Sequence, residues 1–274
     1  VTSSTKCTSY TCSFSNLEIW TSATFHMEKD LYTTGSYMTV DVSGDLDVQS
    51  GGTIYGKGCF TYSGGLDTGD NTCERDGTGQ GMFSSYGGGG GGYGGGGGAG
   101  SSGGAGGSSY GSETNPLFFG AAGGTSESGT YGYGGSGGGI VRLSVDGTLT
   151  NSGLISANGT NGREFTYGGG GGAGGSVNID ANILDGAGTI SANGGAGGND
   201  TSYDGGGGGG GRIAINYSTD NSTWLTALSE SSHTAGGSGY SASDGADGTI
   251  YTNLTVTPPQ ANFTSISANF SRLA

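Results

Sequence analysis

Residues 205–217 read GGGGGGGRIAINY, a glycine tract that runs directly into a stretch in which every second residue is apolar. The same order occurs twice earlier, as GGGGGAGGSVNIDA at 168–181 and as GGGIVRLSV at 137–145. An apolar residue at every second position is typical of a β-strand that buries one face. The three stretches therefore predict three strands, each preceded by glycine.

The apolar positions of these strands recur at a constant interval. Val141 precedes Val177 by 36 residues, and Val177 precedes Ile213 by the same number. The predicted core positions of the repeat are Val141, Leu143, Val177, Ile179, Ile213 and Ile215. Because side chains alternate along a strand, we expect the polar Arg212 and Asn216 to point to the opposite, outward face.

A second motif lies inside each of the first two units, LISANG at 154–159 and TISANG at 189–194. A fixed period that holds two short strands is typical of a solenoid, in which stacking buries an apolar face that one repeat cannot bury alone. We therefore predict an all-β fold, a parallel β-solenoid or β-helix. Weaker copies, GTIY at 52–55 and at 248–251, extend the pattern toward both ends.

Glycine makes up 68 of the 274 residues, against 3 prolines, and lacks the every-third-residue period of collagen. Two structures fit the tracts: flexible loops, or extended threefold helices of the polyglycine II kind that hydrogen-bond side by side. We favour the ordered form, because tracts in step with a stacked repeat are brought next to each other. The main tracts are 87–92, 94–98, 168–172 and 205–211. The tyrosines beside tracts are then expected to be edge caps or surface stacking groups: Tyr86, Tyr93, Tyr131, Tyr133 and Tyr167.

Changes in composition predict three regions. Residues 1–60 contain short alternating stretches and cysteines, which suggests a disulfide-bearing, strand-rich cap. Residues 61–251 hold the glycine-rich solenoid. Residues 252–274 contain Pro258-Pro259 and then alternate again, which fits either a last strand or an arm that completes the sheet of a neighbouring subunit.

The four cysteines fall within the first 73 residues: Cys7, Cys12, Cys59 and Cys73. Short loops close most easily, which favours a Cys7–Cys12 and a Cys59–Cys73 disulfide, with free buried thiols as the alternative. We expect no zinc site, because CxxC spacing is absent and the two histidines, His26 and His233, are far apart in sequence.

Seven N-x-S/T sequons crowd into the second half of the chain and, with the cysteines, favour a secretory route. The candidate glycosylation sites are Asn158, Asn199, Asn216, Asn221, Asn253, Asn262 and Asn269. Asn158 and Asn193 occupy the same place in successive units. Two alternatives follow for Asn158: a hydrogen-bonded asparagine ladder inside the stack, or a glycan.

The net charge of −14, from 8 basic and 22 acidic residues, lacks the positive surface that nucleic-acid binding requires. The same charge disfavours an anionic membrane surface. No apolar run approaches the roughly 18 residues of a membrane-spanning helix. We therefore expect the protein neither to bind nucleic acid nor to insert into a membrane.

Chemistry on polysaccharides needs paired carboxylates, or a carboxylate with a basic group, on one face. The candidates are Asp180, Asp185, Asp200, Asp204, Arg163 and Arg212. Their spacing matches no catalytic arrangement, and solvated turns explain them, so we expect no enzyme. No cofactor is expected either; calcium is the alternative, since residues 197–204, Asp244 and Asp247 loosely match glycine–aspartate turns without the GGxGxDxUx register.

Two segments carry a resemblance to a known type of repeat. The stretches at 188–195 and 205–215, together with Tyr110-Gly111-Ser112 and Asn115-Pro116, resemble a glycine-rich repeat of large secreted surface proteins of bacteria and protists. The similarity covers about residues 38–217. It implies a parallel β-helix-like fold and a role on the cell surface or in an appendage, and it brings no catalytic residues.

These observations favour a structural function. We expect a secreted, extracellular or cell-surface subunit of a fibre, appendage or adhesin that self-assembles through its ends, with copies of itself as partners. The alternative is a glycan- or ice-binding module with a flat face rich in threonine or tyrosine. A polysaccharide-active enzyme is the minor alternative.

Overall fold

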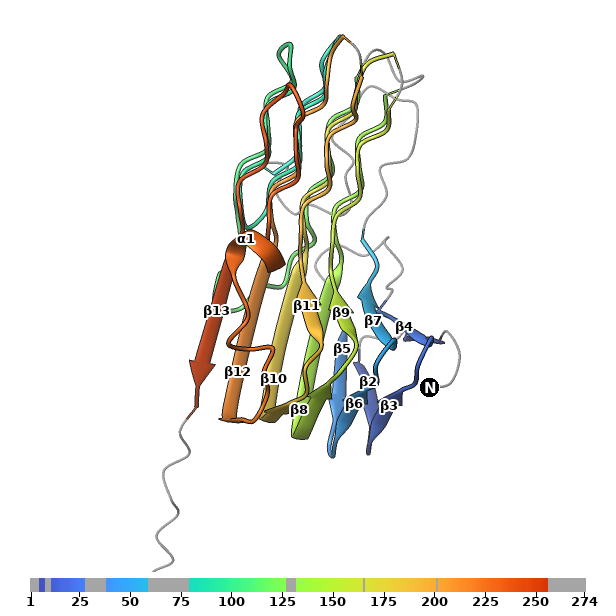
Figure 1. Ribbon diagram of the computed structural model, residues 1–274, viewed down its shortest axis with the longest axis vertical. Coiled ribbons are helices and arrows are strands. Elements are labelled where there is room, and N and C mark those ends of the chain that lie inside the picture. The colour runs from blue at the N-terminus through green and yellow to red at the C-terminus, as the bar shows by residue number, and fades with distance from the viewer. Residues whose placement is uncertain are drawn as a thin grey trace, which may run out of the picture.

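The computed structural model describes residues 5–7, 11–27, 38–58, 79–126, 132–164, 166–200 and 202–255. The described chain is almost entirely β, and every pair of neighbouring strands in its two sheets is parallel (Figure 1). The one helix in these ranges is α1, a single turn at Glu230–His233.

The larger sheet has eight strands in the order β13-β12-β10-β8-β5-β2, with β6 beside β8 and β3 beside β6. Its strands are β2 (Thr11–Phe14), β3 (Leu17–Ile19), β5 (Thr39–Val42), β6 (Leu46–Val48), β8 (Ile140–Asn151), β10 (Ser176–Asp185), β12 (Arg212–Asp220) and β13 (Thr249–Leu254). The long strand β8 pairs with β5 and β6, so strands before the first glycine tract and strands after it share one sheet.

The smaller sheet has five short strands in the order β1-β4-β7-β9-β11. They are β1 (Thr5–Cys7), β4 (Thr24–Met27), β7 (Thr53–Gly56), β9 (Leu154–Ser156) and β11 (Thr189–Ser191). Strands β9 and β11 are the first three residues of the two SANG-containing motifs of the sequence.

The 36-residue interval of the sequence is the register of the larger sheet. Val177 of β10 lies beside Val141 of β8 on one side and beside Ile213 of β12 on the other. The next row pairs Leu143, Ile179 and Ile215 in the same way. All six predicted core side chains are fully buried, with no exposed area.

One apolar cluster joins the two sheets. The smaller sheet contributes a row of isoleucines at Ile54, Ile155 and Ile190, each paired with the next and each without exposed surface. Because burial of a side chain of this size stabilises the fold by about 1.5–3 kcal/mol, the stacked rows supply the apolar driving force that the glycine tracts lack.

The glycine-rich segments extend from one end of the strands as a bundle of long, nearly parallel runs (Figure 1). Residues 168–175 lead into β10 and residues 205–211 lead into β12. Each tract is therefore fixed at its sheet-side end by a strand whose register is set by the core.

Arg212 points away from the Ile213 side of β12, as predicted, but the prediction that this face is open to solvent is wrong. Arg212 and Ala214 lie on the face opposite Ile213, but both are buried, with exposed fractions of 5% and 0%. The segment 110–118 covers this part of the larger sheet, and its Tyr110 carbonyl oxygen binds the Arg212 side chain. The start of β12 is thus buried on both faces, as is common for parallel strands.

Truncating the core row tests the stacking. We expect Ile179→Ala to lower the free energy of unfolding by about 2–5 kcal/mol, because it leaves a cavity between Leu143 and Ile215. Thr219→Ala, at an exposed position of β12, is the control and should change it by no more than about 0.5 kcal/mol. Urea denaturation measures both; equal losses would contradict the shared core.

Candidate functional site

The glycine bundle is the most unusual part of the molecule, and its hydrogen bonds follow a period of three. The N–H groups of Gly170, Gly171 and Gly172 donate to three different neighbouring segments. Their acceptors are the carbonyl oxygens of Gly124, Gly206 and Thr160, at 2.9, 2.9 and 3.0 Å. The next three residues repeat the order, with acceptors Ala121, Gly209 and Ala157.

The tract at 205–211 follows the same rule. Its residues donate in turn to the segments 192–198, 88–91 and 243–246. A backbone that points successive N–H groups in three directions has the threefold symmetry of an extended helix with three residues per turn, rather than the twofold symmetry of a strand. The tracts are therefore ordered by bonds to one another, which answers the question that the sequence left between flexible loops and ordered segments.

Close backbone approach explains why these positions are glycine. A Cβ atom added at Gly170 would overlap the carbonyl oxygen of Gly89, and one added at Gly208 would overlap that of Gly172. Neighbouring backbone, which cannot rotate away as a flexible side chain can, fills the space. Gly96 differs, because its nearest neighbour would lie 3.5 Å from the added atom, an ordinary contact.

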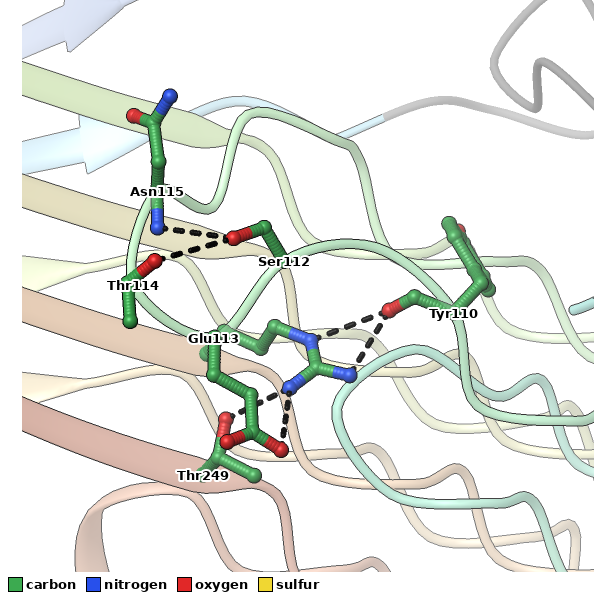
Figure 2. Close-up of polar contacts among 7 residues, drawn as sticks. Tyr110, Ser112, Glu113, Thr114, Asn115 and Thr249 are labelled. Carbon is green, nitrogen blue, oxygen red and sulfur yellow. Dashed lines mark hydrogen bonds and ion pairs between the residues drawn. The ribbon is translucent and has the colours of Figure 1, made fainter.

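A polar cluster around Arg212 clamps the segment 110–118 to the larger sheet at the base of the bundle (Figure 2). The Nε and Nη2 atoms of Arg212 both donate to the carbonyl oxygen of Tyr110, at 3.1 and 2.9 Å. Its Nη1 atom donates to the Thr249 hydroxyl at 2.9 Å and lies 3.5 Å from the Glu113 carboxylate. One buried guanidinium therefore joins β12, β13 and the covering segment.

Tyr93 completes the cluster from the end of the first glycine tract. Its hydroxyl lies 2.6 Å from the Ser176 hydroxyl, which donates to the carbonyl oxygen of Phe118 at 2.6 Å. Since Ser176 gives its only proton to Phe118, Tyr93 is the donor to Ser176. The Arg212 guanidinium lies 5.5 Å from the centre of the Tyr93 ring, within cation–π range.

Burial raises the pKa of Tyr93 to about 12, and the positive charge of Arg212 offsets part of the rise. The ring has no exposed surface. The prediction of a cap or surface stacking group is therefore wrong for Tyr93, because segment 110–118 covers it. Tyr131 lies outside the described residues, and Tyr133 lies with its ring 5.8 Å from the Arg163 guanidinium.

Sequence reasoning gave no role to the segment that forms this clamp. Asn115 accepts a hydrogen bond from the buried Asn178 side chain at 2.8 Å, and its own N–H donates to the Ser112 hydroxyl. The tripeptide at 110–112 and the dipeptide at 115–116 are the elements that carry the resemblance to surface-protein repeats. Their pattern was therefore visible in the sequence, but the partners of Asn115 and Tyr110 lie 63 and 102 residues further along the chain.

Asparagine side chains form hydrogen bonds between successive repeat units, and some of these asparagines are candidate glycosylation sites. Asn158 accepts the N–H of Asn193 at 2.7 Å, and Asn193 in turn accepts the N–H of Ala235 at 2.8 Å. On the outer face of the larger sheet, Asn253 donates to Asn216, which donates to Asp180. The structure contains the ladder that was one of the two alternatives for Asn158.

The remaining described sequons, Asn199 and Asn221, have exposed side chains. Asn262 and Asn269 lie outside the described residues. Cys12 is disulfide-bonded, while Cys59 and Cys73 lie outside the described residues, so the pairing stays a prediction.

The acidic residues considered as catalytic candidates lie in different places. They accept hydrogen bonds from the backbone or from the asparagines of the outer face. Asp180 accepts from Asn216 in the middle of β10, and Asp185 accepts the N–H of Gly186 at the end of that strand. Asp204 is buried in the turn before the 205–211 tract, where it accepts from the Asp200 N–H and from Ser241. Burial disfavours the charged form of Asp204, but these hydrogen bonds outweigh it and lower its pKa.

The other candidates for chemistry or metal binding also have local contacts. His26 packs edge-on against Tyr55, and His233 bonds to Ser229 within its own turn. Asp244 and Asp247 accept the N–H groups of Gly239 and Gly236. Within the described ranges, no group of three or more His, Cys, Asp or Glu side chains is placed to hold a metal ion.

The described part of the chain contains no helix that is long and apolar enough to cross a bilayer. A hollow of about 520 Å³ lies beside β2, β5 and β8, lined by four serines and by Phe14, Asp41, Val42 and Asp146. Comparisons with family models, with curated proteins and with solved structures found no match to this chain.

Substituting glycine tests the close packing of the bundle. We expect Gly208→Ala to destabilise the protein by about 1–3 kcal/mol or more, because the added methyl group overlaps backbone that cannot move independently. Gly96→Ala is the matched control, and should be neutral or stabilising by up to about 1 kcal/mol, since alanine fits there and restricts the unfolded chain. Thermal unfolding of the two variants measures the difference; similar melting temperatures would refute the packing.

The clamp is tested at its guanidinium. Arg212→Lys keeps the charge but loses the fork that binds Tyr110 twice, so we expect a loss of about 1.5–3 kcal/mol and faster amide exchange across residues 110–119. Glu113→Gln should have a much smaller effect, because the Glu113 side chain is 64% exposed and its ion pair is screened by water. Hydrogen exchange followed by mass spectrometry reports both; equal protection in the Arg212 variant and the wild type would rule out the clamp.

Proposed function

We propose that this chain is a structural module of an extracellular fibre, cell-surface appendage or adhesin, with no catalytic role. In this proposal the two parallel sheets are the turns of a β-solenoid, and the glycine bundle that continues from them is a polyglycine II lattice. The observation that carries the proposal is the threefold bonding of consecutive glycines, as at Gly170, Gly171 and Gly172. A lattice bonded in three directions resists bending in each of them, which is the property that a rigid spacer needs.

The composition supports the same role. Glycine makes up a quarter of the chain, and ordering it is costly in entropy. Backbone hydrogen bonds and close packing in the lattice offset that entropy loss. The result is an elongated body, in which the glycine bundle continues from the sheets (Figure 1). The resemblance to repeats of secreted surface proteins, and the exposed sequons at Asn199 and Asn221, fit a secreted, cell-surface location.

Self-assembly through the ends of the larger sheet is the proposed way in which modules join. In the described part of the chain, β13 is the last strand on one side and β2 lies at the other end of the strand path. Thr249 and Thr255 donate their N–H groups inward, to Gly211, which immediately precedes β12, and to Tyr217 of β12. Because a parallel strand turns alternate N–H groups to opposite sides, those of Ile250, Thr252 and Leu254 point away from the sheet. An open edge of this kind pairs readily with another strand, here in a second copy of the chain.

Blocking the open edge tests the assembly. Thr252→Pro removes an outward N–H at an exposed edge position, where proline is tolerated. We expect the wild-type chain to form end-to-end polymers and the proline variant to sediment as monomers in analytical ultracentrifugation. Thr252→Val keeps the N–H group and should polymerise as the wild type does. A wild-type chain that stays monomeric at high concentration in the ultracentrifuge and by electron microscopy would overturn the proposal.

A further inference from the structure

Three tyrosines meet at the end of the glycine bundle that lies farthest from the sheets. Tyr86 and Tyr167 immediately precede the tracts at 87 and 168, and Tyr203 lies two residues before the tract at 205. The tracts at 168 and 205 run from this end into β10 and β12, and the tract at 87 runs beside them in the same direction, since Gly88 donates to Gly168 and Gly91 to Gly171. We call Tyr86, Tyr167 and Tyr203 the tyrosine triad.

The lattice itself brings the triad together. Gly88 donates to Gly168, Gly168 donates to Tyr203, and Gly206 donates back to Gly88, so the three tracts are mutually bonded at this point. The ring centres of the triad are 5.9 Å apart for Tyr86 and Tyr167, 4.5 Å for Tyr86 and Tyr203, and 5.4 Å for Tyr167 and Tyr203. The rings are therefore held by rigid backbone, not gathered by flexible loops.

The triad is partly exposed to solvent and has both apolar and polar groups. Tyr86 is 43% exposed, and the other two rings are partly exposed. Within the described residues, none of the three phenol groups has a hydrogen-bond partner in the protein. The triad thus presents apolar ring surface and three unpaired hydroxyls, each able to donate and to accept a hydrogen bond.

We propose that the tyrosine triad is a binding site for one neutral hexopyranose unit at the end of a glycan chain. A pyranose has an apolar face of C–H groups that packs against an aromatic ring, and a rim of hydroxyls that pairs with phenol groups. The ring planes of Tyr86 and Tyr203 differ by 40°, and that of Tyr167 is nearly perpendicular to Tyr86 at 87°, so the triad is a compact, uneven cluster of touching rings that suits one sugar ring on its exposed side rather than a flat track.

Charge and local composition limit the class of ligand that the triad can bind. The net charge of −14, and the three acidic residues Glu164, Asp200 and Asp204 against the cation Arg163 in the adjoining sequence, disfavour sulfated or carboxylated sugars. The turns beside Tyr167 and Tyr203 carry the polar residues Thr166, Asn199 and Ser202, which favours a hydroxyl-rich ligand over an apolar protein surface. The site is independent of assembly, so its failure would leave the fibre proposal standing, and the reverse also holds.

The test uses the full chain and simple sugars as probes. Saturation-transfer NMR with the methyl glycosides of glucose, galactose, mannose and N-acetylglucosamine should show transfer to ring protons of at least one of them. Tyr86→Ala should weaken that binding by about tenfold or more. Tyr86→Phe keeps the ring packing and loses one hydroxyl, so it should weaken binding by a smaller factor while leaving the melting temperature unchanged.

Controls distinguish specific binding at the triad from non-specific binding to exposed aromatic rings. Trp20→Ala, which removes a 47% exposed aromatic ring on the N-terminal strands, should leave binding unchanged. The proposal is overturned if no glycoside binds, if cyclohexanol or a heparin fragment binds as well as the best neutral glycoside, or if the Tyr86 and Trp20 variants lose binding equally. If Tyr86→Phe binds as the wild type does, the proposed pairing of this hydroxyl with sugar is wrong.

Discussion

The structure depends on the hydrogen bonds that the glycine tracts make in three directions. Each tract needs neighbours on three sides, at a spacing where carbonyl oxygens occupy the place that a Cβ atom would take. Water and side chains are excluded from such a lattice, so a tract left without its neighbours would expose unpaired backbone groups. The high glycine content is therefore a requirement of the architecture and not a sign of disorder, even though ordering glycine is costly in entropy.

The sheets supply what the lattice cannot supply alone, which is a fixed register. The interval that places Val177 beside Ile213 is 36 residues, and the bonds from Gly171 to Gly206 and from Gly174 to Gly209 span 35. A shift of one residue in the strands would turn the apolar row outward and move every glycine donor of the tract to a different neighbour. Core and lattice thus enforce the same alignment, which makes slipped pairings costly on both sides of the junction.

This shared alignment explains which features could be predicted from the sequence. The apolar rows and the side-by-side tracts follow from a local pattern repeated at a fixed interval, and the structure shows them where that pattern places them. Features set by distant partners were not accessible. The tetrapeptide GTIY occurs at 52–55 and at 248–251, yet the first copy enters the smaller sheet and the second enters the larger one. Arg212 and Tyr93 are buried because the segment 110–118, which begins 102 residues before Arg212, folds over both of them.

The position of the clamp follows from a mismatch of symmetry. Arg212 is the first residue after its glycine tract, and Ser176 holds the same place in the preceding unit. At this point a backbone that bonds in three directions becomes a strand that bonds in two, so the segment crossing the junction finds no regular set of backbone donors. Side chains replace them: Arg212 donates to the Tyr110 carbonyl and Ser176 to the Phe118 carbonyl. Since an unpaired buried carbonyl is costly, the junction needs polar side chains where neither the glycine lattice nor strand pairing satisfies the backbone.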